Sequence, residues 1–246
     1  MLYQLTGIDT HIDFGFGITG EAYYSSAQYL FDNKESIKSV QQVEMPTSYL
    51  YRHSIELFLK SLIIIFHKRL KLAYNNEPFD TTKPKVFICG AWKDLYTCHW
   101  IDELYNYWLN ELLLKNKSKL DEIAPKGEWQ EENTISKLFP LIAGYDRDSS
   151  FFRYPITKNS SLDQKKYTMQ RLDLKRLESI FSGEDTRKNK KFGRVFMLLE
   201  NDDKEIVDGF ESTEDVLDNV TQALKEVSYY FYCIHIMTRI TLCGGN

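Results

Sequence analysis

The feature that most constrains this chain is a long helix-compatible segment from Pro46 to about Leu72. Pro46 suits the first turn of a helix, where its missing N–H costs nothing. Neither Gly nor Pro interrupts the segment until residues 75–78, Asn-Asn-Glu-Pro, which predict its end. Because most of its side chains are apolar, we expect this helix to lie at the centre of the fold, with the other elements packed around it.

A charged stripe interrupts the apolar surface of this predicted helix. Arg52, His53, Glu56, Lys60 and His67 fall within a sector of about 100° when the helix is projected at 100° per residue. A narrow polar sector between apolar walls predicts a cleft or a set of polar partners. The pairs Arg52–Glu56 and Glu56–Lys60 are four residues apart and therefore neighbours. Partly buried charges need such pairing, because their desolvation is costly otherwise.

The end of the chain predicts a second long helix with a packing seam. Its apolar residues alternate at spacings of three and four, which is the pattern of a helix that packs against another helix. They are Leu217, Val220, Leu224, Val227, Phe231 and Ile234. In the central helix, Ser54 and Ser61 stand one heptad apart and would let a neighbouring helix approach closely.

Shorter patterns complete the expected architecture. Helices are predicted over about 20–30, 95–114, 133–143 and 172–181, and short strands at 86–88 and 193–200. Residues 144–155 are expected to form an ordered loop or a short strand. The chain is therefore predicted to be mainly α, a bundle of about five to six helices with a few short peripheral strands.

No repeat, low-complexity tract or linker divides the sequence, which predicts a single domain over 1–246. We divide it into an N-terminal arm and helix (1–45), a core motif region (46–155), and a peripheral insert followed by the long C-terminal helix (156–246). The role of residues 156–211 stays open at this point.

Composition and charge limit the class of protein and the cellular compartment that we expect. Net charge is -4, so the chain lacks the overall basic surplus typical of nucleic-acid binders. The four cysteines show no C-x-x-C spacing, and no leader-like start is evident, so we expect reduced thiols in the cytoplasm. The apolar run 57–66 contains Lys60 and is too short to span a bilayer. The basic runs at 68–71 and 187–191 are interpreted as solvated surface.

Two segments offer partners for the charged stripe. His99 opens the predicted third helix, and the loop at 146–155 carries Arg153. If these side chains converge with Arg52 and Glu56, the site suits an anionic group such as phosphate, and its histidines suit proton transfer. The competing interpretation is a buried structural network of paired charges. His67 and His235 are interpreted as structural.

Three short blocks carry a family resemblance. The segment 49–60 (YLYRHSIELFLK) resembles the RH-x-x-E-L-x-L-K helix of bacterial HEPN-like proteins. In that pattern a histidine-led helix follows, matched by 99–104 (HWIDEL), and later an FRYP motif, matched by 152–155. The resemblance covers roughly residues 46–155, and it rests on the order and combination of the three blocks.

The resemblance implies a helical bundle, commonly dimeric. Many HEPN proteins are metal-independent ribonucleases of toxin–antitoxin and phage-defence systems, and others bind nucleotides, nucleic acid or a partner protein. The family's usual active-site motif is Arg, four to six residues, then His. No arginine of this chain precedes a histidine at that spacing, and Arg52 and His53 are adjacent instead.

Two functions follow as expectations. The first is a metal-independent ribonuclease that acts on RNA or a nucleotide as a homodimer, without a metal or another cofactor. Its candidate catalytic residues are His53, His99, Arg52 and Glu56, and its candidate substrate-binding residues are Lys60, Arg153 and Tyr154. The alternative is a non-catalytic helical binding or interaction module of a defence or regulatory complex, in which the stripe holds the bundle together or binds an anionic ligand. A metalloenzyme using Asp146 and Asp148 is a third, weaker reading, because no ligand spacing such as H-E-x-x-H occurs.

Overall fold

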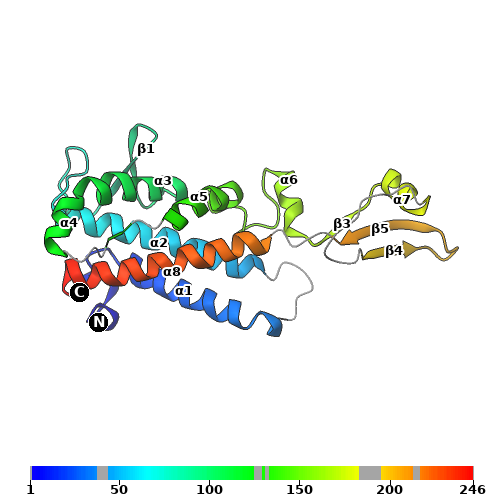
Figure 1. Ribbon diagram of the computed structural model, residues 1–246, viewed down its shortest axis with the longest axis horizontal. Coiled ribbons are helices and arrows are strands. Elements are labelled where there is room, and N and C mark those ends of the chain that lie inside the picture. The colour runs from blue at the N-terminus through cyan, green and yellow to red at the C-terminus, as the bar shows by residue number, and fades with distance from the viewer. Residues whose placement is uncertain are drawn as a thin grey trace.

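A single long helix forms the centre of the molecule. The computed structural model describes residues 2–37, 44–124, 129–130, 133–182, 195–212 and 217–245. Helix α2 (Glu44–Leu70) has 27 residues, and α1 (Phe16–Asp32) and α8 (Leu217–Cys243) pack along it (Figure 1). Most side chains of α2 are buried, including those of its charged stripe. The prediction of a long central helix is confirmed.

The two ends of α2 follow local chemistry. Pro46 lies in the first turn, as expected, although the helix already begins at Glu44. The helix ends at Leu70, earlier than the predicted stop, because Lys71 adopts a left-handed conformation with φ 57°. The N–H of Leu72 then donates to the carbonyl of His67 at 2.9 Å, which satisfies a carbonyl of the last turn.

Helix α8 packs against α2 through the predicted seam. Small hydroxyl side chains let the two helices approach: Ser54 Oγ lies 2.6 Å from Ser228 Oγ, and Ser48 Oγ lies 2.8 Å from Thr221 Oγ1. The expected role of Ser54 is thereby confirmed, whereas Ser61 donates to Asp13 instead. All six predicted seam residues are buried: Leu217, Val220, Leu224, Val227, Phe231 and Ile234.

A second layer of helices closes the bundle. Its elements are α3 (Ile101–Asn106), the π-helical turn η4 (Tyr107–Leu113), the 3-10 turn η5 (Leu114–Asn116), α4 (Lys117–Ile123) and α5 (Asn133–Asp146). Aromatic rings fill the space between this layer and α8. Tyr105 stacks on Phe139 at 3.8 Å between centroids, and Phe231 meets Trp108 edge to face at 5.4 Å. The predicted helix over 95–114 therefore begins about six residues later than expected.

Three 3-10 turns and one β-hairpin complete the helical part of the molecule. The N-terminal arm contains the 3-10 turns η1 (Leu2–Leu5) and η2 (Ile8–Thr10), and a third, η3 (Lys34–Ser36), follows α1. Strands β1 (Lys85–Ile88) and β2 (Ala91–Asp94) pair antiparallel. Cys89 and Gly90 both have positive φ, at 52° and 75°, as a tight two-residue hairpin turn requires. The strand predicted at 86–88 is confirmed, and β2 was not predicted.

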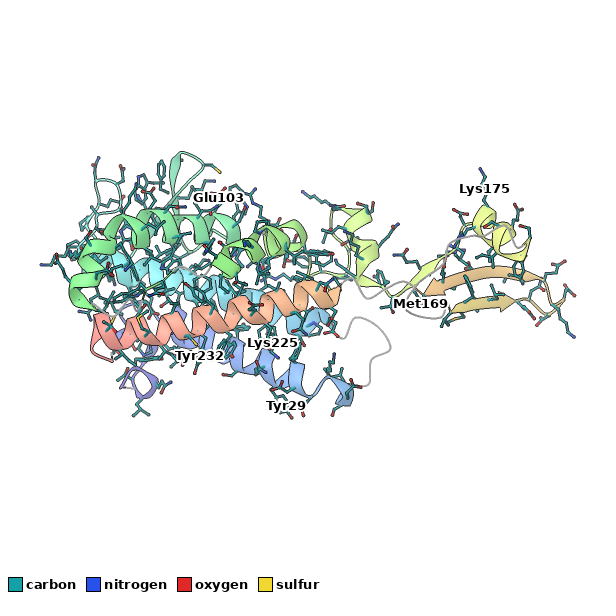
Figure 2. All side chains as sticks on the ribbon, viewed as in Figure 1. Tyr29, Glu103, Met169, Lys175, Lys225 and Tyr232 are labelled. Carbon is teal, nitrogen blue, oxygen red and sulfur yellow. The ribbon has the colours of Figure 1, made fainter. Side chains whose placement is uncertain are left out.

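A small sheet unit projects beyond the bundle (Figures 1 and 2). Its elements are β3 (Met169–Arg171), α7 (Leu174–Phe181), β4 (Phe196–Glu200) and β5 (Ile206–Ser212). Helix α6 (Ser160–Asp163) and the 3-10 turn η6 (Gln164–Lys166) precede it and contact the bundle, since Leu162 packs against the core. The strands are antiparallel in the order β3-β5-β4. The sequence predicted α7 and β4, whereas β3 and β5 were missed. In Figure 2 the side chains near Met169 and Lys175 stand apart from the dense packing around Tyr232.

The expectation of a mainly α chain with a few short strands is confirmed. Of the helices in the described ranges, none is both long and apolar enough to cross a membrane. The treatment of residues 1–246 as a single domain stays a prediction. The basic run at 187–191 lies outside the described residues.

Candidate functional site

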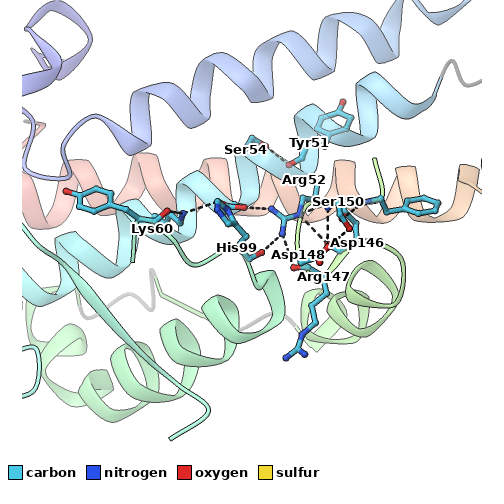
Figure 3. Close-up of polar contacts among 12 residues, drawn as sticks. Tyr51, Arg52, Ser54, Lys60, His99, Asp146, Arg147, Asp148 and Ser150 are labelled. Atoms are coloured by element: carbon cyan, nitrogen blue, oxygen red, sulfur yellow. Dashed lines mark hydrogen bonds and ion pairs between the residues drawn. The ribbon is translucent and has the colours of Figure 1, made fainter. Parts of the chain in front are cut away.

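Arg52 is the most heavily bonded residue of the charged stripe (Figure 3). Its side chain is fully buried, with 0% exposed. Nη1 donates to Glu56 Oε2, and Nη2 donates to the backbone carbonyl of His99. Nη2 also donates to the carbonyl of Arg147 at 3.0 Å, and Nε donates to the carbonyl of Asp146 at 3.3 Å. All three guanidinium nitrogens therefore bind protein atoms.

These bonds fasten two separate loops to α2. The carbonyl of His99 belongs to the segment before α3. Asp146 is the last residue of α5, and Arg147 begins the loop that follows it. The two loops also bond each other, because the N–H of Ile101 donates to the carbonyl of Arg147 at 3.1 Å. A planar guanidinium with several fixed donors suits such a junction better than an ammonium does.

Lys60 and Glu56 extend this junction along the helix. Lys60 Nζ lies 3.0 Å from Glu56 Oε1 and donates to the carbonyl of Tyr96 at 3.1 Å. Glu56 is 1% exposed. Burial alone would raise the pKa of Glu56, but its hydrogen bond with His99 and the charges of Arg52 and Lys60 hold the pKa far below its ordinary value. We call Arg52, Glu56 and Lys60, with the carbonyls they bind, the Arg52 clamp.

His99 is the partner of the clamp that reaches solvent. Its Nδ1 lies 2.9 Å from Glu56 Oε1, and 48% of its side chain is exposed. Because an ionised carboxylate only accepts, Nδ1 is the donor in this bond, which leaves Nε2 for other partners. The ring borders a pocket of about 150 Å³ lined by Lys93, Asp94, Thr97, Cys98, His99 and Trp100.

Asp146 supports the clamp from the α5 side. Its Oδ1 accepts from the N–H of Phe151 at 2.9 Å. Its Oδ2 is buried without a hydrogen bond and lies 3.8 Å from Arg52 Nε. Burial raises the pKa of Asp146, and the Arg52 charge offsets only part of that effect. At 3.8 Å the ion pair is loose, so the backbone carbonyls are the firmer partners of Arg52.

His53 and Arg153 lie in a neighbouring group around Tyr49. The His53 ring stacks on Tyr49 at 5.7 Å between centroids and meets Tyr23 edge to face at 4.6 Å. Burial lowers the pKa of His53, and its Nδ1 makes no hydrogen bond. The exposed Arg153 lies over the rings of Tyr49 and Tyr154, at 5.9 and 5.8 Å. The structure thus joins His99 to Arg52 and Glu56 as expected, whereas the expected contact of Arg153 with that cluster is not seen.

His67, the last residue of the predicted stripe, bonds groups outside it. Its Nδ1 bonds the carbonyl of Leu72 at 2.7 Å, and its Nε2 bonds Tyr107 Oη at 2.9 Å. Burial lowers the pKa of His67 to about 4. Both ring nitrogens therefore form hydrogen bonds near the end of α2, which agrees with the interpretation of His67 as a structural residue.

The sequence analysis missed a second buried ionic cluster. Arg239 pairs with Asp13, and both side chains are fully buried. Ser61 Oγ donates to Asp13 Oδ2 at 2.5 Å, and Arg239 Nε donates to His235 Nε2 at 3.2 Å. Burial alone would raise the pKa of Asp13, but the charge of Arg239 and the hydrogen bonds from Ser61 and from the N–H of Gly17 hold the pKa below its ordinary value. The only signal in the sequence was His235 and Arg239, four residues apart in an apolar helix.

Within the described residues, no three His, Cys, Asp or Glu side chains gather as a metal site would require. Comparison with models of protein families, with curated proteins and with solved structures finds no match to this chain. The resemblance to HEPN-like proteins therefore rests on the three sequence blocks alone.

Proposed function

We propose that this chain is a non-catalytic, HEPN-like helical binding module, in which the Arg52 clamp holds the bundle together and the His99 pocket receives a small anionic group. One observation carries this proposal. The charged groups of Arg52, Glu56 and Lys60 are buried and already bound to protein atoms, so they are not free to hold a substrate.

The chemistry of the His99 pocket supports an anionic ligand of phosphate size. His99 presents a ring edge to the pocket, and Glu56 orients it from behind. Lys93 lines the same pocket and supplies an ammonium, with its Nζ 4.3 Å from the Trp100 ring centroid. Asp94 also lines it, but its Oδ1 already accepts from the N–H of Tyr96 at 2.8 Å. In this proposal His99 binds the anion as an imidazolium, which donates through Nε2 as well as through Nδ1. Together with the Lys93 ammonium it favours a phosphate or a nucleoside monophosphate.

The test is calorimetric titration of the purified chain with inorganic phosphate and, separately, with adenosine monophosphate. We expect both to bind, and we expect His99→Ala and Lys93→Ala each to weaken binding about tenfold or more, since each removes a charge-assisted contact. Lys115→Ala is the matched control, because Lys115 pairs with Glu111 on another surface. Binding that His99→Ala leaves unchanged would refute the assigned pocket.

A specific observation favours one second candidate, the metal-independent ribonuclease. A histidine oriented through Nδ1 by a buried carboxylate, with Nε2 free, is the arrangement of a general acid or base. In this candidate His99 Nε2 takes the proton of a ribose 2′-hydroxyl, whose oxygen attacks the adjacent phosphorus. The bond from phosphorus to the 5′-oxygen breaks, which leaves a 2′,3′-cyclic phosphate, and the 5′-oxygen takes a proton from water. The expected second histidine, His53, is stacked on Tyr49 instead.

Incubation with mixed RNA in EDTA separates the two candidates. The binding-module proposal predicts no cleavage by the wild-type chain. Cleavage that persists in EDTA and disappears in His99→Ala would establish the ribonuclease and refute the proposal. Cleavage that survives His99→Ala would point to a contaminating nuclease and would leave the binding experiment to decide.

A further inference from the structure

Helices α1 and α8 separate along their length and leave a pocket between them. They are in close contact where Gly17 faces His235. Further along, the two helices separate toward the end of α1 (Figure 1). The pocket there has a volume of about 430 Å³, which is within the usual range of small-molecule sites. The described residues that line it are Tyr24 and Gln28 of α1, and Gln222, Lys225, Glu226 and Tyr229 of α8.

The α1 side of this pocket is held in place by contacts within the chain. Tyr51 Oη donates to Gln28 Oε1 at 3.2 Å, and Gln28 Nε2 donates to the two carboxylate oxygens of Asp32 at 2.9 and 3.0 Å. The ring of Tyr24 stacks on Tyr232 of α8 at 4.7 Å between centroids. Because these side chains are fixed without a ligand, binding costs little ordering of this wall.

The α8 side of the pocket carries one charge of each sign, and the chain neutralises neither. Lys225 and Glu226 are adjacent in the sequence, and adjacent residues of a helix do not face each other. No oppositely charged residue stands three or four positions from either of them. Within the described ranges no ion pair involves either side chain. Lys225 Nζ lies 3.7 Å from the centroid of the Phe31 ring instead.

The charges beside the pocket keep this balance of signs. Asp32 lies at its edge as the hydrogen-bond partner of Gln28. Lys34 Nζ lies 5.8 Å from the centroid of the Phe31 ring, which it shares with Lys225. A ligand with a single charge would therefore meet a like charge as well as an opposite one. A ligand that carries both charges pairs with both ends of the α8 side.

Aromatic rings favour a flat ligand. Tyr24 supplies a ring from α1 and Tyr229 supplies one from α8, where its side chain is 57% exposed. Tyrosine rings prefer an aromatic partner in an offset-stacked or edge-to-face contact. The pocket therefore combines a place for an aromatic ring with one site for a negative group and one for a positive group.

We propose that the pocket between α1 and α8 binds a free aromatic α-amino acid as its zwitterion. The α-carboxylate pairs with Lys225, the α-ammonium pairs with Glu226, and the aromatic ring lies between Tyr24 and Tyr229. The ligand then satisfies both unpaired charges and contacts both rings at once. This inference is independent of the pocket at His99, which is formed by residues 93–100.

Calorimetric titration of the full chain with L-phenylalanine, the simplest member of this class, tests the binding. We expect L-phenylalanine to bind at millimolar concentration, and we expect Tyr229→Ala to weaken binding about tenfold, since it removes one ring contact. Tyr29→Ala is the matched control, because Tyr29 lies on α1 outside the pocket lining and is 68% exposed (Figure 2). No binding, or binding that Tyr229→Ala leaves unchanged, would overturn the proposal.

Analogues that lack one charge test the ionic contacts. 2-Phenylethylamine has no carboxylate and 3-phenylpropionate has no ammonium, so both should bind the wild type more weakly than L-phenylalanine. Lys225→Met keeps the apolar stem and removes the ammonium. It should weaken L-phenylalanine about tenfold without weakening 2-phenylethylamine.

Glu226→Gln provides the reciprocal test. It should weaken L-phenylalanine about threefold, a smaller effect because Glu226 is exposed and its charge is screened by solvent. Binding of 3-phenylpropionate should not weaken. Equal affinity of the wild type for L-phenylalanine and both analogues would refute the zwitterion. So would an equal loss of L-phenylalanine and of the analogue that lacks the matching charge.

Discussion

Glu56 shows at the residue scale why the charged stripe is stable inside the fold. It receives Arg52, Lys60 and His99 on its two carboxylate oxygens. The contacts with Arg52 and Lys60 lie in an interior where water competes little, so they are stronger than on the surface. The same burial makes the residue hard to replace, because loss of one charge leaves the others without a counterion.

Glu56→Gln should therefore lower the free energy of unfolding by about 3–5 kcal/mol, because Arg52 and Lys60 stay buried without their nearest negative charge. Urea unfolding followed by circular dichroism measures this loss. Glu111→Gln is the matched control, since Glu111 forms an exposed ion pair with Lys115, four residues later in the sequence. Its expected cost is below about 1 kcal/mol. Similar small losses for both variants would contradict the structural role of the stripe.

His67 gives the stability of the chain a defined pH dependence. Burial lowers the pKa of its imidazole to about 4, whereas an unfolded chain titrates near about 6.5. Between these values the unfolded state binds the extra proton, so stability is complete above about pH 6.5 and declines as the pH falls toward 4. The expected loss is on the order of 3 kcal/mol.

Thermal unfolding between pH 7 and 4.5 measures this decline, and His67→Gln isolates it. The substituted chain cannot titrate at this position, so its melting temperature should change less over the same range. This pH range stays at or above the ordinary pKa of glutamate, so protonation of Glu56 contributes little to the change in stability. Parallel curves for the two proteins would mean that His67 does not control the effect.

At the scale of elements, close contact between α1 and α8 is maintained by a glycine. An added Cβ at Gly17 would lie 2.0 Å from His235 Nε2 and 2.8 Å from Asp13 Oδ2. Both neighbours belong to the buried cluster around Arg239. Because these groups are hydrogen-bonded and enclosed, they cannot move aside without breaking the cluster.

The same substitution at two helical glycines should therefore have opposite effects. Gly17→Ala should destabilise the chain by about 1–3 kcal/mol through overpacking. Gly144→Ala, in α5 with open space around the added Cβ, should stabilise it by about 0.5–1 kcal/mol, because alanine favours a helix. Differential scanning calorimetry of both variants provides the measurement. Stabilisation by Gly17→Ala would show that α1 lies further from α8 than described.

At the scale of the whole molecule, two buried ionic groups fasten segments that are distant in the sequence. The Arg52 clamp joins α2 to the loops at 96–101 and 146–147, and Asp13–Arg239 joins the N-terminal arm to α8. The apolar core fills the space between them. The bundle is therefore closed by ionic contacts as well as by apolar packing, while the sheet unit extends outside it (Figure 1).

Local patterns predicted the elements better than the site. The seam of α8 was visible because packing against α2 imposes a periodic apolar spacing, as at Leu224 and Phe231. The pair of Arg52 with Glu56 was predicted from its spacing, but the other partners of Arg52 were not, because they are backbone carbonyls and carry no residue signature. The ion pair of Asp13 with Arg239 spans 226 positions, and only the three-dimensional fold brings its ends together.

Strand β5 was missed because Asp208 and Gly209 interrupt its apolar pattern. Pairing on both sides, with β3 and β4, stabilises it despite this composition.

Hydrogen–deuterium exchange of Arg52→Lys tests the central claim most directly, that Arg52 fastens two loops to α2. Lysine keeps the positive charge near Glu56 but lacks the fork that reaches three carbonyls. We expect amide exchange at 96–101 and 146–151 to become about tenfold faster or more, since hydrogen bonds to a charged donor are lost. Exchange at 224–231 of α8 should stay slow. Unchanged exchange in both loops would contradict the account.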